Sequence, residues 1–456
     1  MDLKQVHNVY FIGIGGIGMS ALARYFHRLG CQVSGYDKTE TALTRSLEEE
    51  GMRIHYVEDL DQLPEAVDLV VYTPAVPAQH QELKFYQNSE TPVVKRSQVL
   101  GWISQQNYTV AVAGTHGKTT TSSMIAHILH HAKVDCTAFV GGITRNYNTN
   151  LVVSETAQAT VVEADEFDRS FLTLHPHVAV VTSMDADHLD IYGDHQYLLE
   201  SFDLFAQQVQ DGGLLVYRKG LKFNTDFQYR SWTYAVEEVA DYQANGVGVV
   251  DGHFVFNVAG PHENLQNLRL ALPGRHNVEN ALAAIAVAYE FGLEGPIIRE
   301  AIESYEGVKR RFEYVLKRDD LVVIDDYAHH PEELKATISS VRELYPNRKI
   351  TGVFQPHLYS RTRDFEEEFA QSLALLDELI LLEIYPAREL PIEGVTSAKL
   401  LEKVPLDHKS LSNKANLVNH LADQELEVLL MLGAGDIDTL IQPVRDMLTE
   451  KQKANT

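Results

Sequence analysis

Apolar runs of strand length alternate with helix-like segments along the chain. The runs expected to form buried strands are 8–14, 31–36, 68–72, 108–113, 160–162, 178–182, 321–324, 350–354, 379–384 and 428–432. Between them, apolar residues recur at helical spacing, as at Met19, Leu22 and Phe26 ahead of Gly30. Strands that alternate with helices in this way predict an α/β protein with parallel sheets.

The strand pattern restarts twice along the chain, and each restart predicts a new domain. A chain of 456 residues has room for about three domains of ~150 residues each. We therefore expect a Rossmann-like N-terminal domain at 1–105, a central P-loop domain at 106–306 and a Rossmann-like C-terminal domain at 307–456.

The composition is that of a globular protein and narrows the choice of partners. Hydrophobic residues make up 45% of the chain and charged residues 23%. A net charge of -25 argues against nucleic acid or an anionic membrane as the main partner. Two distant cysteines, Cys31 and Cys136, fit a reducing compartment, and the chain shows neither a signal-peptide pattern nor an unbroken apolar run of ~18 residues. These features predict a cytoplasmic protein.

A glycine-rich motif follows the first expected strand. Gly13, Gly15, Gly16 and Gly18 match G-x-G-x-x-G between a strand and a helix, and Asp37 ends the next strand. Glycines let the backbone approach a diphosphate, and the N–H groups of the helix start can bind it. The motif predicts binding of a dinucleotide or nucleotide diphosphate, although a tight structural turn would also use such glycines.

A second glycine motif follows the strand at 108–113 and opens a helix. Its residues are Gly114, Thr115, His116, Gly117, Lys118, Thr119 and Thr120. In a P-loop the backbone amides and the lysine hold the β- and γ-phosphates, while the first hydroxyl binds Mg²⁺. The loop is abbreviated, because Val112 stands where the full pattern has glycine. A structural turn with a solvated lysine would leave the successive threonines unexplained.

Acidic residues follow the next two expected strands. Glu163 and His188 are the residues we expect to bind Mg²⁺ together with Thr119, because both fall at the sheet edge where ligands of parallel sheets bind. Acidic loops are also commonly just solvated, and only the P-loop upstream favours a metal. The neighbouring acids are expected to play supporting roles, namely Asp165, Glu166, Asp185 and Asp187.

Four further polar motifs remain. GRHNVEN (274–280) precedes an alanine-rich helix expected at 281–289, and helix capping is the ordinary interpretation of such residues. KRRFE (309–313) could reach a phosphate or be a solvated linker. DDYAHHP (325–331) and FQPHLYSRTR (354–363) follow strands and lack a complete zinc ligand set. Their acid, histidine and arginine side chains suit recognition of a small zwitterion.

The chain resembles the Mur ligases, and within that family the alanine-adding members, over its whole length. The segments that carry the resemblance are FIGIGGIGMSALA, GTHGKTTT, EADEFDRSFL, DADHLDIY, GRHNVENALAA, RRFE, DDYAHHPEE and FQPHLYSRTRD. It implies a UDP-substrate domain, a central ATPase domain and an amino-acid-binding domain. It also implies ATP and Mg²⁺ as cofactors, UDP-N-acetylmuramate and L-alanine as substrates, and an acyl-phosphate intermediate.

The resemblance also implies roles for individual residues. The catalytic set would be Lys118, Glu163, His188 and Arg311. Nucleotide contacts would come from the phosphate loop (114–120), Asn277, Asn280 and Arg311. The UDP-sugar would lie at Gly13, Gly15, Gly16, Gly18, Asp37 and Thr73, and the amino acid at Tyr327, His329 and Arg361.

Two positions qualify these carried-over roles. Many alanine-adding members have an arginine where this chain has Leu358. The carbamylated lysine of several other Mur ligases has no counterpart, since no lysine occurs between His188 and Arg218. The alternatives are a ligase that recycles cell-wall tripeptide, a nicotinamide-dependent oxidoreductase and a non-catalytic nucleotide-regulated binding protein. The sequence leaves the oligomeric state open between monomer and homodimer.

Overall fold

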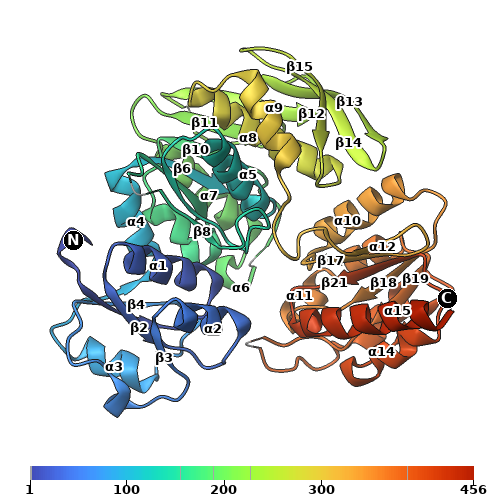
Figure 1. Cartoon of the computed structure of the whole chain (residues 1–456), viewed down its shortest axis with the longest axis horizontal. Coiled ribbons are helices and arrows are strands. Elements are labelled where there is room, and N and C mark those ends of the chain that lie inside the picture. The colour runs from blue at the N-terminus through green and yellow to red at the C-terminus, as the bar shows by residue number, and fades with distance from the viewer. Residues whose placement is uncertain (1–2, 155, 188, 226, 388, 456) are drawn as a thin grey trace. The chain divides into compact units, whose positions relative to one another are not determined.

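The computed structural model describes residues 3–455 except 155, 188, 226 and 388 (Figure 1). Its internal contacts divide the chain into two compact units. The first unit comprises Met1–Asn245, Asn257–Leu268 and Glu279–Tyr305, and the second comprises Gly246–Phe256, Arg269–Val278 and Glu306–Thr456. The boundaries at 105 and 306 stay predictions, because the first unit combines the N-terminal sheet with most of the central region.

The N-terminal part of the first unit is a parallel sheet with helices. Its elements are η1 (Leu3–Gln5), β1 (Asn8–Ile12), α1 (Ile17–Arg28), β2 (Gln32–Tyr36), α2 (Ala42–Glu49), β3 (Arg53–His55), η2 (Leu60–Gln62), β4 (Leu69–Tyr72), α3 (Gln81–Gln87), β5 (Val93–Lys95) and α4 (Arg96–Gln106). The strand order is β3-β2-β1-β4-β5, with every neighbouring pair parallel. This order confirms the Rossmann-like expectation and puts all strand carboxyl ends at one edge.

The central region is built on a ten-stranded sheet. Its elements are β6 (Tyr108–Ala113), α5 (Lys118–His131), β7 (Cys136–Phe139), β8 (Leu151–Val152), β9 (Ala159–Ala164), η3 (Phe167–Thr173), β10 (Val178–Val181), α6 (Leu189–Tyr192), α7 (His195–Gln207), β11 (Leu214–Arg218), β12 (Arg230–Val236), β13 (Tyr242–Val250), β14 (His253–Ala259), β15 (Leu265–Leu270), α8 (Arg275–Glu290) and α9 (Gly295–Ser304). The strand order is β15-β14-β13-β12-β11-β10-β6-β9-β7-β8. β6 therefore lies between β9 and β10, and it is parallel to both.

Two local expectations for the central region were wrong, and four strands were not expected at all. Glu163 lies inside β9 instead of after it, because the strand continues to Ala164. The helix expected from residue 281 begins at Arg275, so the GRHNVEN segment forms its first turns. The strands β12 to β15 were not expected, although β14 alternates buried and partly exposed residues along its length.

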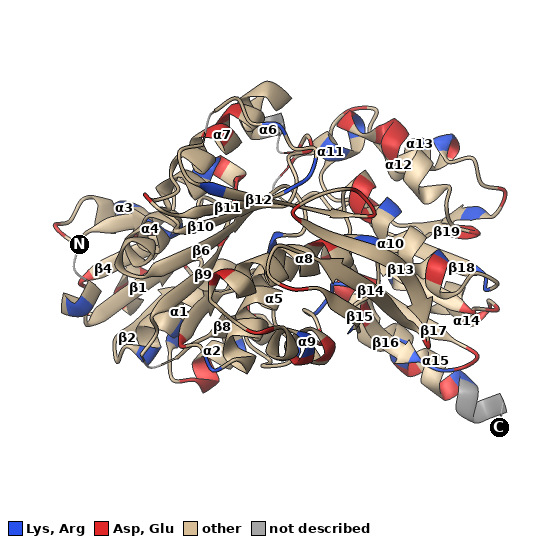
Figure 2. Ribbon diagram, turned by 90° about the horizontal axis from the view of Figure 1, so that it is seen from above, with Lys and Arg blue, Asp and Glu red and all other residues tan. Residues whose placement is uncertain are grey.

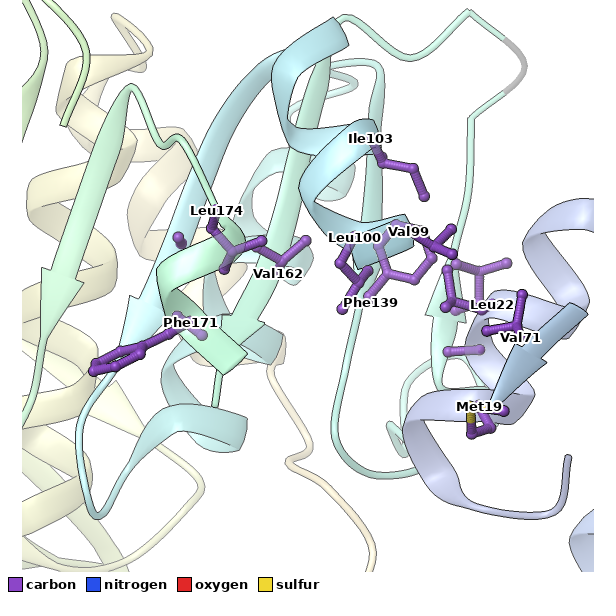
Figure 3. Packing of buried hydrophobic residues seen from close by; sticks show 14 of the residues in the cluster. Met19, Leu22, Val71, Val99, Leu100, Ile103, Phe139, Val162, Phe171 and Leu174 are labelled. Carbon is purple, nitrogen blue, oxygen red and sulfur yellow. The ribbon is translucent and has the colours of Figure 1, made fainter. Parts of the chain in front are cut away.

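An apolar core inside the first unit packs helices of the N-terminal sheet against the central sheet. Figure 3 shows Leu22 of α1 and Val99 of α4 in the same buried cluster as Phe139 of β7 and Leu174, which follows η3. The approach of α4 to η3 is close, since a Cβ added at Gly101 would lie 2.5 Å from Thr173 O. Ion pairs from Lys95 to Asp168 and from Arg96 to Asp165 connect the carboxyl edge of the first sheet with η3 and with the residues after β9.

The second unit contains a six-stranded sheet. Its main elements are β16 (Glu313–Lys317), β17 (Val322–Asp326), α10 (Pro331–Leu344), β18 (Ile350–Phe354), α11 (Tyr359–Asp364), α12 (Glu366–Leu373), β19 (Glu378–Leu381), α13 (Ser397–Lys403), β20 (Lys409–Leu411), α14 (Lys414–Ala422), β21 (Val428–Leu432), η4 (Asp436–Leu440) and α15 (Ile441–Asn455). The order is β16-β17-β21-β18-β19-β20, and only β16 runs antiparallel to its neighbour. The expected Rossmann-like sheet is confirmed.

Charged residues lie mainly on helices and loops, and the strand ribbons are mostly uncharged (Figure 2). Parallel strands covered on both faces are expected to be apolar. Among the helices that the structure describes, none combines the length and the apolar composition needed to cross a bilayer.

Candidate active site

The first glycine loop lies at the carboxyl end of β1. Gly13 has a φ of 85°, which favours glycine, and an added Cβ would lie 2.8 Å from Thr73 Cγ2. The N–H of Gly15 donates to Asp37 Oδ2 at 2.7 Å. Gly16 is the N-cap of α1, and no side chain caps this helix start. The structure thus brings Gly13, Gly15, Asp37 and Thr73 together at an open helix N-terminus.

The phosphate loop lies between β6 and α5. Gly114 has a φ of 134°, and an added Cβ there would overlap Thr182 Oγ1 and lie 2.8 Å from Ser183 N. Gly117 is the N-cap of α5 with a φ of 82°. Both glycines are therefore required by backbone conformation or by close approach.

Residues after β10 hold this loop in place. Ser183 Oγ lies 2.9 Å from Thr115 Oγ1 and accepts a hydrogen bond from the N–H of His116 at 2.8 Å. The Thr182 hydroxyl donates to the carbonyl oxygen of His116. The N–H of Asp185 donates to Thr115 Oγ1 at 3.1 Å. Thr182 and Ser183 are neighbours of the phosphate loop that the sequence alone did not reveal.

Lys118 lies at the start of α5 against a buried carboxylate. Its Nζ donates to Glu166 Oε2 at 2.8 Å and to Gly114 O at 2.7 Å. The side chain of Glu166 is fully buried. Burial acts to lower the pKa of Lys118, but the surrounding carboxylates, Glu166 first among them, outweigh it and raise the pKa. Lys118 is therefore a charged donor at the mouth of the phosphate loop.

Glu163 and Thr119 present oxygen atoms side by side. The Thr119 hydroxyl donates to Glu163 Oε2 at 3.2 Å, and Glu163 Oε1 accepts from Gly141 N at 2.6 Å. A hydroxyl and a carboxylate beside a phosphate loop are the hard oxygen donors that Mg²⁺ prefers, so these residues fit the cation. His188, the other expected ligand, lies outside the described residues.

The two asparagines expected to contact nucleotide lie in the first turns of α8. In the first unit, Asn280 Oδ1 accepts from the Thr121 hydroxyl at 3.1 Å, and a Cβ added at Gly117 would lie 2.7 Å from that same oxygen. Asn280 is therefore next to the phosphate loop. Asn277, which is assigned to the second unit, is buried and donates through Nδ2 to Pro273 O at 2.5 Å.

In the second unit, the residues expected to bind the amino acid form a connected cluster. The rings of Tyr327 and His329 are 5.3 Å apart, and His329 lies 5.8 Å from the ring of His357. Arg361 is buried, with Nη1 3.4 Å from His357 Nδ1. Arg311 lies over the other part of this cluster, with Cζ 5.0 Å from the centre of the Tyr327 ring.

The sequence reasoning missed three members of this cluster. Glu333 Oε2 lies 3.1 Å from His329 Nδ1, and its Oε1 lies 3.7 Å from Arg311 Nη1. His357 stacks on Tyr385 at 5.8 Å. His357 could have been found, because it belongs to the motif that contains Arg361. Tyr385 belongs to no sequence motif. It joins the cluster because it forms a parallel β-bridge with His357 beyond the ends of β18 and β19.

Family models match three successive parts of the chain. Residues 8–108 match the Mur ligase family catalytic domain, 112–288 the Mur ligase middle domain, and 310–437 the Mur ligase glutamate ligase domain.

Curated relatives match the whole length. A UDP-N-acetylmuramate--L-alanine ligase of Parabacteroides distasonis is 48% identical over 99% of this chain and 99% of its own length. The protein of the same name from Flavobacterium johnsoniae is 50% identical over 99% of this chain and 100% of its own.

Solved structures share the fold. The UDP-N-acetylmuramate-alanine ligase of Thermotoga maritima aligns with a TM-score of 0.83 at 28% identity, covering 98% of this chain and 100% of that one. A murein peptide ligase of Psychrobacter arcticus aligns with a TM-score of 0.70 at 23% identity, covering 97% and 98%. The chain belongs to the Mur ligase family.

Proposed function

We propose that the protein is an ATP- and Mg²⁺-dependent ligase that joins L-alanine to UDP-N-acetylmuramate in peptidoglycan precursor synthesis. The observation that carries the proposal is the start of α5, next to the phosphate loop, where Lys118 Nζ lies beside Glu166 and Thr119 Oγ1 lies beside Glu163. The names of the full-length relatives support the choice of substrates.

Each part of the site has a step to perform. The uncapped start of α1 and the loop from Gly13 to Gly18 bind the diphosphate of the UDP-sugar. Lys118 and the loop amides bind the β- and γ-phosphates of ATP. Thr119, Glu163 and His188 would hold Mg²⁺, which would supply positive charge to the phosphate oxygens. These groups orient the sugar carboxylate for in-line attack on the γ-phosphorus, with ADP as the leaving group.

The cluster of the second unit serves the second half of the reaction. The guanidinium of Arg361 pairs with the carboxylate of alanine, while Tyr327 and His329 line its pocket. The neutral amine then attacks the carbonyl carbon of the acyl phosphate, the C–O bond to phosphate breaks, and the amine releases its proton. Arg311 contacts the ATP phosphates, and Asn277 and Asn280 contact the adenine.

The proposal also assigns a substrate to each part of the chain and a cellular compartment to the reaction. Residues 1–105 bind the UDP-sugar, 106–306 bind ATP and 307–456 bind the amino acid. Both cysteines are free and buried, which fits a reducing compartment, and we place the reaction in the cytoplasm.

A coupled assay tests the function. Purified protein is mixed with ATP, Mg²⁺, UDP-N-acetylmuramate and L-alanine, and both phosphate release and the mass of the nucleotide-sugar product are followed. We expect one phosphate per amide formed and no release when any substrate is omitted. Turnover with the cell-wall tripeptide in place of alanine would instead identify a recycling ligase. Nucleotide binding without turnover would contradict both.

A further inference from the structure

Arg96 lies where the glycine loop of the first sheet meets the acidic motif of the central sheet. It is the first residue of α4 and directly follows β5, so it lies at the same carboxyl edge as the loop after β1. Both neighbours belong to the first unit. The short strand β5 was not expected from the sequence, and Arg96 belongs to none of the sequence motifs.

The guanidinium of Arg96 packs directly against Gly18. A Cβ added at Gly18 would overlap Nη1 and would lie 3.0 Å from Cζ and 3.2 Å from Cδ of Arg96. Gly18 is inside α1, and its φ lies outside the left-handed region. An alanine there would suit the helix backbone and improve helix propensity by up to about 1 kcal/mol. Glycine at this position leaves room for the Arg96 guanidinium where it lies, and an alanine would displace that guanidinium.

The same guanidinium also contacts Asp165. Arg96 Nη2 donates to Asp165 Oδ2 at 3.3 Å, a longer contact than the 2.7 Å between Lys95 Nζ and Asp168 Oδ2 beside it. The Arg96 side chain is 24% exposed. Arg96 is thus oriented by one carboxylate while Nη1 faces the start of α1.

Charge at this helix start points to an anion. Asp37 directs Oδ2 to the Gly15 N–H and Oδ1 to the Thr39 N–H, whereas the start of α1 carries partial positive charge and the adjacent Arg96 guanidinium carries a full one. A guanidinium next to uncapped helix N–H groups forms a stronger phosphate site than either feature alone. Resting on the proposed function, we propose that Arg96 binds the diphosphate of the UDP-sugar and that Gly18 exists to admit it.

Calorimetry with UDP, UDP-N-acetylmuramate and ADP tests this assignment. Arg96→Ala is expected to weaken UDP and UDP-N-acetylmuramate binding alike, by about 10- to 100-fold, because the diphosphate is common to both. Arg96→Lys should lose less, since it keeps the charge without the fork of donors. ADP affinity should be unchanged in each variant, which also reports that the protein is folded. Arg53→Ala, an exposed arginine in β3 at the far strand end, is the matched control.

Gly18→Ala supplies the decisive comparison. It should reproduce the loss of Arg96→Ala, and the double variant should bind no more weakly than either single variant. Additive losses would overturn the steric role of Gly18. Unchanged UDP affinity in Arg96→Ala, or a loss confined to the sugar-bearing ligand, would overturn diphosphate binding by Arg96 while leaving the proposed function intact. Wild-type protein that bound ADP but neither UDP ligand would overturn the proposed function and this assignment together.

Discussion

Nζ of Lys118 lies 2.8 Å from Oε2 of Glu166, and the Glu166 side chain has no exposed surface. A buried ion pair is expensive to break by removing one partner, because the remaining charge has lost its counterion. The proposed function therefore gives Lys118 two separable roles. One is phosphate binding, and the other is neutralisation of Glu166.

Lys118→Ala is expected to abolish ligation and also to cost stability, on the order of 3 kcal/mol. The double variant Lys118→Ala/Glu166→Gln should recover most of that stability. It should not recover turnover, because the ATP phosphates still lack the positive charge of the Lys118 side chain. Thermal unfolding and the phosphate-release assay check the two effects separately. Near-normal turnover in a folded Lys118→Ala protein would contradict the P-loop assignment.

Glu163→Gln is expected to raise the Mg²⁺ concentration for half-maximal activity about 10- to 100-fold. Glutamine keeps an oxygen for the Gly141 N–H but removes the negative charge beside Thr119. Excess Mg²⁺ should restore much of the turnover, which separates metal binding from misfolding. His188→Ala tests the second expected ligand in the same titration. Wild-type Mg²⁺ curves for both variants would place the cation elsewhere.

Because His127 is buried, we expect the free energy of unfolding to fall as the pH is lowered. Burial, with a smaller contribution from His131, lowers the pKa of His127 from 6.5 to about 4, and its Nδ1 lies 2.7 Å from the Tyr147 hydroxyl. Between pH 6.5 and 4 the unfolded chain binds this proton and the folded chain does not, so stability falls as the pH falls. The loss approaches about 3 kcal/mol at the lower end.

His127→Gln removes the titrating group from the same position. Its melting temperature should therefore fall less than that of the wild type between pH 7 and pH 5, even if it starts lower. Parallel melting-temperature curves for the two proteins would show that His127 does not titrate on unfolding.

The sequence predicted those parts of the fold and of the site that depend on residues close together along the chain. Both glycine loops and their strands follow from runs within about ten residues, and the structure places Asp37 next to Gly15 as the spacing suggested. The start of α8 was missed because polar residues at 274–280 resemble caps, whereas Asn277 and Asn280 are buried in the helix. Arg96 and Tyr385 were missed because only the packing of separate elements brings them to a site.

Arg361→Ala is expected to raise the KM for L-alanine about 10- to 100-fold and to change the KM for ATP and UDP-N-acetylmuramate much less. Arg361 is buried beside His357, so its charge is directed within the cluster instead of toward solvent. Arg363→Ala is the matched control, because Arg363 lies in the same short helix with its side chain 54% exposed and paired with Asp364. Steady-state kinetics with each substrate varied in turn distinguishes the two variants.

A substitution at Leu358 gives a second test of carboxylate binding by Arg361. Leu358 precedes α11 with a φ of 70°, is buried, and carries no charge. If Arg361 binds the alanine carboxylate as proposed, Leu358→Arg in the Arg361→Ala background should return part of the alanine affinity, because it restores a guanidinium near that position. An equal rise in KM for all three substrates would mean that Arg361 supports the fold of the second unit. The carboxylate would then have to be bound around His329.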